Sequence, residues 1–204
     1  MLNTEDLYDL VCTRLLAQRG QSFSHDLKLA MMGRKAPEAI QLLRAACQLS
    51  ESVEQLVAES DQLLREVLDA GSGSAQMPGL QTLLKLLEEK RIPKAIATSS
   101  SRHFAHRVLG TFDLVRRFEF VLCGDDVTHG KPHPEIYLAA AERLAVSPAS
   151  LVVLEDSILG SQAAVSAGAF AVAIPSQARR AGDFDHVHLV VPSLDAAELV
   201  DIFG

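Results

Sequence analysis

The chain lacks the excess of positive charge that nucleic-acid-binding proteins usually carry. It has 19 Lys and Arg residues against 26 Asp and Glu residues, a formal net charge of −7 at pH 7 and a sequence pI of about 5.5. The basic pairs Arg34-Lys35, Arg116-Arg117 and Arg179-Arg180 are scattered, and no aromatic residues interleave with them to stack on bases. We therefore expect no nucleic-acid partner and interpret most of these pairs as solvated surface.

Cysteines and long apolar runs are also scarce. The three cysteines, Cys12, Cys47 and Cys123, are widely spaced and form no CxxC pair, which predicts free thiols in a reducing compartment. No apolar run approaches the length of a membrane span, and the first ten residues, MLNTEDLYDL, carry acids where a signal peptide carries bases. Together these absences predict a soluble, cytoplasmic protein with no membrane partner, and we expect a monomer or a weak dimer.

The pattern of apolar residues changes near residue 75. From Glu5 to about Ala70, segments such as APEAIQLLRAACQL and SVEQLVAESDQLLREVL place apolar residues at helical spacing, with Ser50 and Ser52 as candidate caps for the second. The segment GSGSAQMPG, residues 71–79, has the most flexible composition in the chain. It is the best candidate for a domain boundary.

Beyond this boundary, short apolar runs alternate with helical segments. The apolar runs are PKAIATSSS, FEFVLCGDD, LVVLEDS, AFAVAIP and HLVVPSLDAAELV, and helices are expected over 101–109, 134–145 and 157–167. This alternation predicts an α/β fold, a Rossmann-like parallel sheet covered by helices on both faces. Such sheets bind ligands at the carboxyl ends of their strands.

Polar residues suited to phosphate chemistry follow three of the predicted strands. Thr98 and Ser99 follow the first, Lys131 lies on the loop after the second, and Glu155 and Asp156 end the third. A hydroxyl with free amides can hold phosphate oxygens, a lysine can neutralise them, and two carboxylates can hold Mg²⁺. We predict that these groups meet in one site.

Each group also has a simpler interpretation. Thr98 or Ser99 could serve only as a helix N-cap, and Glu155 with Asp156 could cap the helix that follows them. An isolated lysine is usually solvated, but Lys131 stands in HGKPHPEIY, directly after a glycine and before a proline, where the backbone is conformationally unusual. These neighbours indicate that the backbone holds the Lys131 ammonium group in a defined direction.

Four further polar residues near Lys131 receive weaker assignments. Asp125 and Asp126 are interpreted as turn residues that at most support the site. His129 and His133 flank the lysine without a metal-ligating partner at suitable spacing, so they are interpreted as loop histidines.

These motifs resemble those of the haloacid dehalogenase (HAD) superfamily of phosphatases and phosphomutases. Thr98 in AIATSSS resembles its second motif, Lys131 in HGKPHPEIY its third, and LVVLEDSILGSQAAVSAGA its acidic fourth motif. MMGRKAPEAIQLL and the later MPG are similar to the pseudouridine-5′-phosphatase and β-phosphoglucomutase-like branch. The resemblance implies a remnant of the core at 1–4, a helical cap domain at 5–72 and a Rossmann-like core domain at 73–204.

One departure from the family concerns the first motif. Family members begin with a strand that ends in DxDGT and continues to D/N-T-E, and Asn3-Thr4-Glu5 matches only the tail of that motif. The nucleophilic aspartate, the acid/base aspartate and the central first strand have no counterpart. We hypothesise that Met1 is internal to DGTMLNTE in a longer product, and we expect the chain as given to be inactive and its sheet to have two unpaired edges.

The resemblance implies catalytic roles for Thr98 and Lys131, phosphate binding by Thr98, Ser99 and Lys131, and Mg²⁺ binding by Glu155 and Asp156. It also implies substrate contacts from the cap loop Gly33-Arg34-Lys35, although Arg34 is equally compatible with a surface position. The expected activity is Mg²⁺-assisted hydrolysis of a small phosphorylated metabolite, a nucleoside or sugar phosphate. The alternatives are a non-catalytic protein that binds phosphometabolites or a protein partner, and a sugar phosphomutase.

Overall fold

The computed structural model describes residues 1–2, 4–70, 76–175 and 181–204. The chain forms two compact units: a helical unit, Leu2–Gln76, and an α/β unit that comprises Met1 and Met77–Gly204. Asn3 and the predicted boundary between residues 72 and 73 lie outside the described residues.

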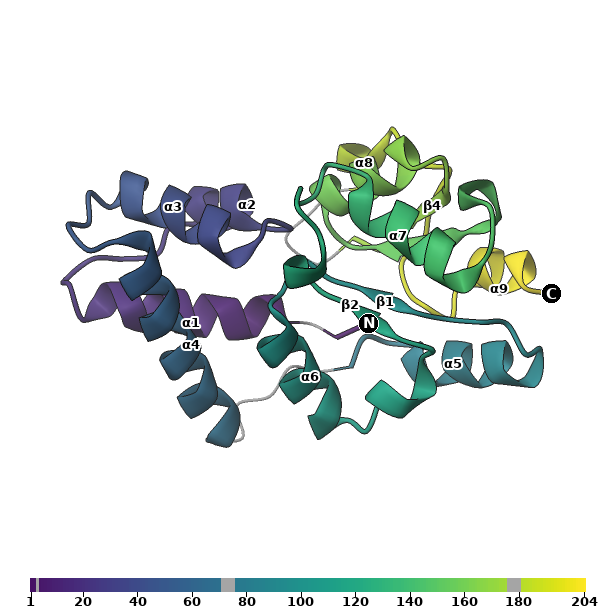
Figure 1. Ribbon diagram of the computed structural model, residues 1–204, viewed down its shortest axis with the longest axis horizontal. Coiled ribbons are helices and arrows are strands. Elements are labelled where there is room, and N and C mark those ends of the chain that lie inside the picture. The colour runs from purple at the N-terminus through teal and green to yellow at the C-terminus, as the bar shows by residue number, and fades with distance from the viewer. Residues whose placement is uncertain (3, 71–75, 176–180) are drawn as a thin grey trace. The chain divides into compact units, whose positions relative to one another are not determined.

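The helical unit contains the three helices expected from apolar spacing and one further short helix, α2, which has no buried residues and which that spacing did not indicate. The helices are α1 (Glu5–Ala17), α2 (His25–Met31), α3 (Ala36–Ala46) and α4 (Val53–Asp69) (Figure 1). Helix α1 packs against α4, and α3 packs against both α2 and α4, burying Leu15, Leu43 and Leu56. Ser52 caps α4 in a reciprocal arrangement, because its Oγ accepts from Gln55 N at 3.2 Å while Ser52 N donates to Gln55 Oε1 at 2.9 Å.

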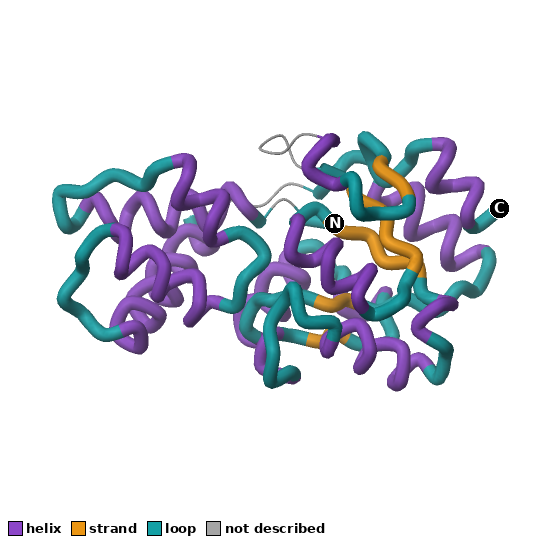
Figure 2. Tube along the Cα trace, turned by 90° about the horizontal axis from the view of Figure 1, so that it is seen from above, coloured by secondary structure: helices purple, strands orange, loops and turns teal. Residues whose placement is uncertain are grey.

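The α/β unit contains short strands separated by helices (Figure 2). The strands are β1 (Ile96–Ala97), β2 (Val121–Leu122), β3 (Val152–Glu155), β4 (Phe170–Ala173) and β5 (Leu189–Val190). The helices are α5 (Leu80–Glu89), α6 (Arg102–Thr111), α7 (Glu135–Leu144), α8 (Ile158–Ser166) and α9 (Ala197–Ile202), with short 3-10 turns at Val115–Arg117, Gly124–Asp126, Pro148–Ser150 and Ala181–Phe184. The predicted α/β class with a parallel sheet is confirmed.

The strands form two parallel ladders rather than one continuous sheet. Strand β1 pairs with β2, and the second ladder has the order β3-β4-β5. Helix α7 packs against β1, whereas α8 packs against β3 and β4. Within the described residues, no strand pairs with the remaining edge of β1 or of β3.

The two ladders nevertheless share one apolar core. Leu122 of β2 and Val153 of β3 belong to the same buried cluster as Ile136 and Tyr137 of α7 and the alanines of α8. Since α7 packs beside β1 and also contacts α8, this helix connects the ladders. The carboxyl ends of β1, β2 and β3 therefore belong to one packed unit, in which the groups that follow them can act together.

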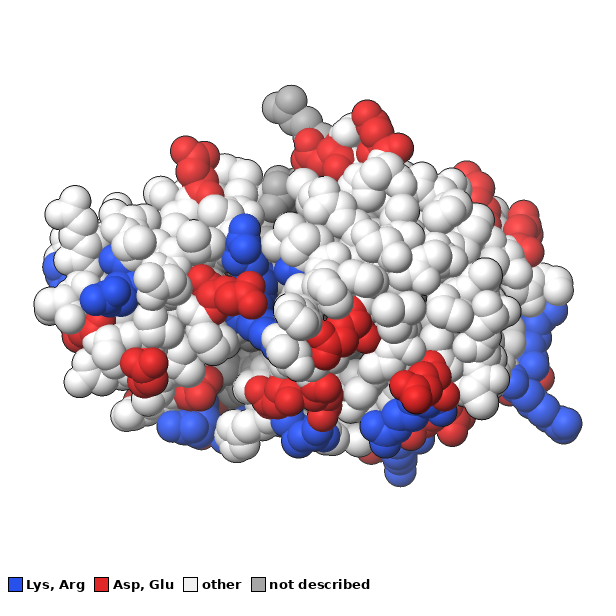
Figure 3. All heavy atoms as spheres, turned by 45° about the horizontal axis from the view of Figure 1, so that its top comes forward, with Lys and Arg blue, Asp and Glu red and all other residues white. Residues whose placement is uncertain are grey.

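Surface charge and helix length bear on the expected partners of the chain. On the face shown in Figure 3, Lys and Arg side chains lie among Asp and Glu side chains instead of forming a continuous basic stripe. Within the described ranges, no helix combines the length and the apolar character that a membrane crossing requires.

The cysteines should differ strongly in reactivity. Cys12 and Cys123 are buried, and burial raises the pKa of Cys12 to about 12 and that of Cys123 to about 11, whereas Cys47 is partly exposed. Because the thiolate is the reactive form, we expect one thiol to react rapidly with a disulfide reagent at pH 8 and two to react slowly until the chain unfolds. Cys47→Ser should remove the fast phase, and three equally fast thiols would contradict the assignment.

Candidate functional site

Lys131 is the buried cation of the α/β unit's candidate site. It follows Gly130 and precedes a cis Lys131-Pro132 peptide bond, and its residue is only 6% exposed. Its Nζ donates to the carbonyl oxygen of Ala97, the last residue of β1, at 3.3 Å and forms an ion pair with the carboxylate of Glu155, the last residue of β3. Lys131 thus joins the carboxyl ends of the two ladders.

The Glu155 carboxylate is hydrogen-bonded through both of its oxygens. Oε1 accepts from Lys131 and from the Tyr137 hydroxyl, and Oε2 accepts from the Ser157 Oγ at 3.0 Å. Burial by itself raises the pKa of Glu155, but the charge of Lys131 and these hydrogen bonds outweigh it and hold the pKa below its ordinary value. Glu155 is therefore an ionised, fully partnered carboxylate.

A glycine makes room for this carboxylate. Gly160 lies in the first turn of α8, where its N–H donates to the Ser157 Oγ at 3.0 Å. A Cβ at Gly160 would lie 2.1 Å from the carboxyl carbon of Glu155, well inside van der Waals contact. The Glu155 carboxylate therefore occupies the space that a side chain at position 160 would need.

Asp156 has a different electrostatic environment from its neighbour. Burial, followed by the negative charge of Glu155, raises the pKa of Asp156, and the positive charges of the Met1 amino group and of Lys131 only partly oppose this. The carboxyl groups of Asp156 and Glu155 in turn act on the Met1 amino group, whose pKa burial lowers. Asp156 thus lies where additional positive charge would favour its ionised form.

Thr98 follows β1 directly and lies next to the carbonyl that Lys131 contacts. The Thr98 Oγ1 accepts from the N–H of Ser100 at 3.1 Å, whereas the cap of α6 is Ser101, whose Oγ accepts from Phe104 N at 3.4 Å. The alternative in which Thr98 or Ser99 caps this helix is therefore wrong. Ser99 packs closely on the loop after β2, since its carbonyl oxygen would be 2.5 Å from a Cβ at Gly124.

The alternative in which Glu155 and Asp156 cap the helix that follows them is also wrong. The N-cap of α8 is Ser157. Glu155 supports this cap only indirectly, because its carboxylate accepts a hydrogen bond from the Ser157 hydroxyl. The acidic pair does not itself cap the helix.

Asp125 and Asp126 lie in the turn after β2 and hold α6 in place. The Asp125 Oδ2 accepts from the N–H of Arg102, the first residue of α6, at 2.6 Å. Asp126 accepts from Cys123 N at 2.8 Å and pairs with the Arg102 guanidinium. Both residues connect the loops that follow β1 and β2.

Two residues that support the site were not among those predicted from the sequence. Tyr137 and Ser157 are both buried, and both donate to Glu155. Burial, reinforced by the charge of Glu155, raises the pKa of Tyr137 well above its ordinary value, so its phenol remains a donor. The only signal in the sequence was their position: Tyr137 ends HGKPHPEIY, and Ser157 directly follows the acidic pair.

The predicted cap loop Gly33-Arg34-Lys35 lies between α2 and α3 in the helical unit. Gly33 has a positive φ of 78°, and Lys35 occupies the N-cap position of α3. The Arg34 side chain is half-buried and donates from Nε to the carbonyl oxygen of Ala30 at 2.9 Å. Substrate contacts from these three residues stay a prediction.

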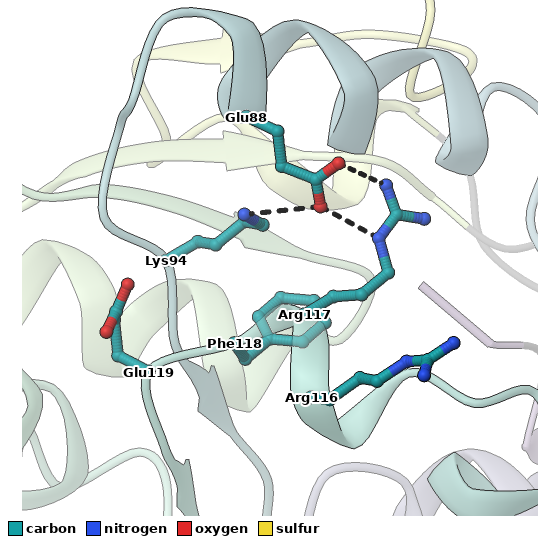
Figure 4. A pocket seen from close by; sticks show the side chains of 6 residues that line it. All are labelled: Glu88, Lys94, Arg116, Arg117, Phe118 and Glu119. Atoms are coloured by element: carbon teal, nitrogen blue, oxygen red, sulfur yellow. Dashed lines mark hydrogen bonds and ion pairs between the residues drawn. The ribbon is translucent and has the colours of Figure 1, made fainter.

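A pocket of about 530 Å³ lies elsewhere on the α/β unit (Figure 4). Its lining residues are Glu88, Lys94, Arg116, Arg117, Phe118 and Glu119. The Arg117 guanidinium makes two hydrogen bonds of 2.8 Å to the Glu88 carboxylate, which also pairs with Lys94 at 3.5 Å. These residues precede β1 and β2, whereas the groups around Lys131 follow the strands. The pocket is thus at the opposite end of the ladder from the candidate site.

Comparison with known proteins identifies the family of the chain. The family model of haloacid dehalogenase-like hydrolases matches residues 1–174. The chain belongs to this family. The matched range includes Thr98, Lys131, Glu155 and Asp156.

Individual HAD relatives cover most of the chain. The phosphorylated carbohydrates phosphatase of Thermotoga maritima is 35% identical over 82% of this chain and 77% of its own length. A protein of Drosophila melanogaster named as a probable pseudouridine-5′-phosphatase is 30% identical over 95% of this chain and 85% of its own length. The crystal structure of β-phosphoglucomutase from Clostridium difficile has a TM-score of 0.86 at 21% identity, covers 100% of this chain and 92% of its own, and shows the shared fold.

Proposed function

We propose that this HAD family member has the phosphate site of a phosphomonoester hydrolase that acts on a small phosphorylated metabolite. The observation that carries the proposal is the position of the Lys131 Nζ, which contacts the end of β1 beside Thr98 and the Glu155 carboxylate at the end of β3. The names of the relatives support a sugar or nucleoside phosphate as the substrate class.

In this proposal the chain's residues hold the phosphoryl group. The Thr98 hydroxyl and the Ser99 backbone amide bind phosphoryl oxygens, and the Lys131 ammonium neutralises their charge. Lys131 is already fixed by Ala97 and Glu155, so little reorganisation is needed when phosphate binds. The proposal keeps Gly33, Arg34 and Lys35 as candidate residues for substrate contact, as the family resemblance implies.

The carboxylates suit Mg²⁺, which prefers hard oxygen ligands. Asp156 is the stronger candidate ligand, because burial beside Glu155 raises its pKa and a divalent cation would offset that unfavourable charge, whereas the oxygens of Glu155 already accept hydrogen bonds. When bound, Mg²⁺ supplies shielding of the charge on the phosphoryl oxygens. The covalent step of the family needs an aspartate nucleophile, for which residues 1–204 offer no counterpart to the family's first motif.

Two forms of the protein test the proposal: the chain as given, and a version with a strand that ends in DxDGT placed before Met1. Release of inorganic phosphate would be measured on sugar phosphates, nucleoside 5′-phosphates and glycerol phosphate, with Mg²⁺. We expect turnover only in the extended form. Phosphate binding without turnover in either form would favour a non-catalytic phosphometabolite-binding protein, and interconversion of sugar phosphates would favour a mutase.

Binding measurements isolate the individual groups. Thr98→Val in the extended form should weaken inorganic phosphate binding roughly 3- to 10-fold, the effect of one lost hydrogen bond of about 1 kcal/mol. Thr82→Val, at an exposed position of α5, is the matched control. Asp156→Asn should weaken Mg²⁺ binding, whereas Asp201→Asn, at an exposed position, should not. Equal phosphate and Mg²⁺ titrations in all four variants would remove these assignments.

A further inference from the structure

Two histidines and a glutamate gather on the turn that carries Lys131. One ligand atom from each of His129, His133 and Glu135 lies within 4.8 Å of the other two. The His129 Nδ1 is 2.9 Å from the Glu135 Oε2, the His133 Nδ1 is 3.9 Å from the same oxygen, and the ring centroids are 4.5 Å apart. From the sequence, these histidines were interpreted as loop residues without a ligating partner. Glu135 is that partner, supplied by the first residue of α7.

The turn itself is held by the same glutamate. Its Oε1 and Oε2 accept from the backbone N–H groups of Thr128 and His129 at 2.7 and 2.8 Å, and these hydrogen bonds lower the pKa of Glu135 to about 2. The N–H of His133 donates to the Gly130 carbonyl at 3.0 Å. The backbone positions of the three residues are therefore fixed without any bound ion.

The side chains remain accessible above this fixed backbone. The His129 and His133 side chains are 63% and 50% exposed, and that of Glu135 is 29% exposed. The ligand atoms of a tetrahedral Zn²⁺ site lie roughly 3 Å apart, so modest rotation of two exposed rings would bring the three atoms to coordinating distance. The carboxylate can either bind the ion directly or accept a hydrogen bond from the far nitrogen of a ligating imidazole.

We propose that His129, His133 and Glu135 form a surface Zn²⁺ site, separate from the Glu155 and Asp156 carboxylates. Two imidazoles with one carboxylate favour Zn²⁺ over Mg²⁺ or Ca²⁺, which select oxygen ligands. Three protein ligands leave the fourth position to water. Because Lys131 lies midway between the two histidines in the chain, the bound ion closes a ring around the turn that presents the lysine and restrains its backbone.

The test is titration of the chain with Zn²⁺ by calorimetry in excess Mg²⁺, which competes for oxygen-only sites. We expect one equivalent of Zn²⁺ to bind, and its affinity to fall at least tenfold in His129→Ala/His133→Ala. The matched control, His25→Ala/His106→Ala, removes two exposed imidazoles elsewhere and should bind as the parent does. Identical isotherms for the parent and both double variants would overturn the proposal.

Amide hydrogen exchange locates the site independently. In the parent chain, saturating Zn²⁺ should slow exchange within residues 128–137 and leave the helical unit unchanged, and His129→Ala/His133→Ala should abolish this protection. Comparison of the metal-free exchange rates of the parent and the variant shows whether the variant is folded. Zn²⁺ protection that maps elsewhere, or that persists in the folded double variant, would refute the site even if Zn²⁺ binds. Neither readout depends on phosphatase activity.

Discussion

Lys131→Ala is expected to lower the free energy of unfolding of the α/β unit by about 3–5 kcal/mol, the usual cost of leaving a buried charge without its partner. Lys131 is 6% exposed and Glu155 is 8% exposed, so solvent cannot replace the ammonium group. Tyr137 and Ser157 would still donate to the carboxylate, but they carry no charge to offset its burial. Exchange of amides in β3 and β4 measures the effect within the unit, since a two-unit chain need not unfold in one transition.

Further variants separate the effect of charge from that of packing. Lys131→Met keeps most of the side-chain volume and should be nearly as destabilising as Lys131→Ala, whereas Tyr137→Phe removes one hydrogen bond and should cost about 1–2 kcal/mol. Combining Lys131→Met with Glu155→Gln should cost less than the sum of the single changes, because it removes both charges. Lys85→Ala, whose side chain is 76% exposed, should cost under about 0.5 kcal/mol. A Lys131→Ala variant as mild as Lys85→Ala would show that the pair does not stabilise the unit.

The sequence was most informative where local pattern and topology agree. Apolar spacing predicted α1, α3 and α4, whereas α2, which buries no residue, gave no such signal; the alternation of strands and helices predicted parallel pairing. Because parallel strands place their carboxyl ends at one edge, the sequence also indicated that the loop of Lys131 would lie near the ends of the first and third predicted strands. The structure brings the Lys131 Nζ to Ala97 O and to Glu155.

Side-chain partnerships were less accessible from the sequence. Tyr137 reaches Glu155 because α7 packs beside the ladders, and Glu135 approaches the histidines because the turn folds back on its own helix. Neither approach follows from residue type or from helical or strand period. The choice between Thr98 and Ser101 as the cap of α6 likewise depends on where the helix begins, which propensity locates only within a few residues.

In the acidic motif, glycine is required at position 160 because of a neighbouring side chain, and not because of its own backbone conformation. Gly160 lies in α8 and its φ is not in the left-handed region, so alanine would ordinarily stabilise the helix by up to about 1 kcal/mol. At this position, however, the added Cβ would be 2.1 Å from the Glu155 carboxyl carbon. The carboxylate would have to move, and its bonds with Lys131, Tyr137 and Ser157 would weaken together.

We therefore expect Gly160→Ala to destabilise the α/β unit by about 3 kcal/mol or more, combining the cost of overpacking with loss of a buried ion pair. Gly110→Ala is the matched control, because Gly110 is also in a helix, α6, and a Cβ there has no neighbour within 4 Å. That variant should gain roughly 0.5–1 kcal/mol, so the two substitutions should have opposite signs in the same hydrogen-exchange or urea-unfolding measurement. Stabilisation by both would mean that the Glu155 carboxylate can move without cost and that its network does not fix the end of β3.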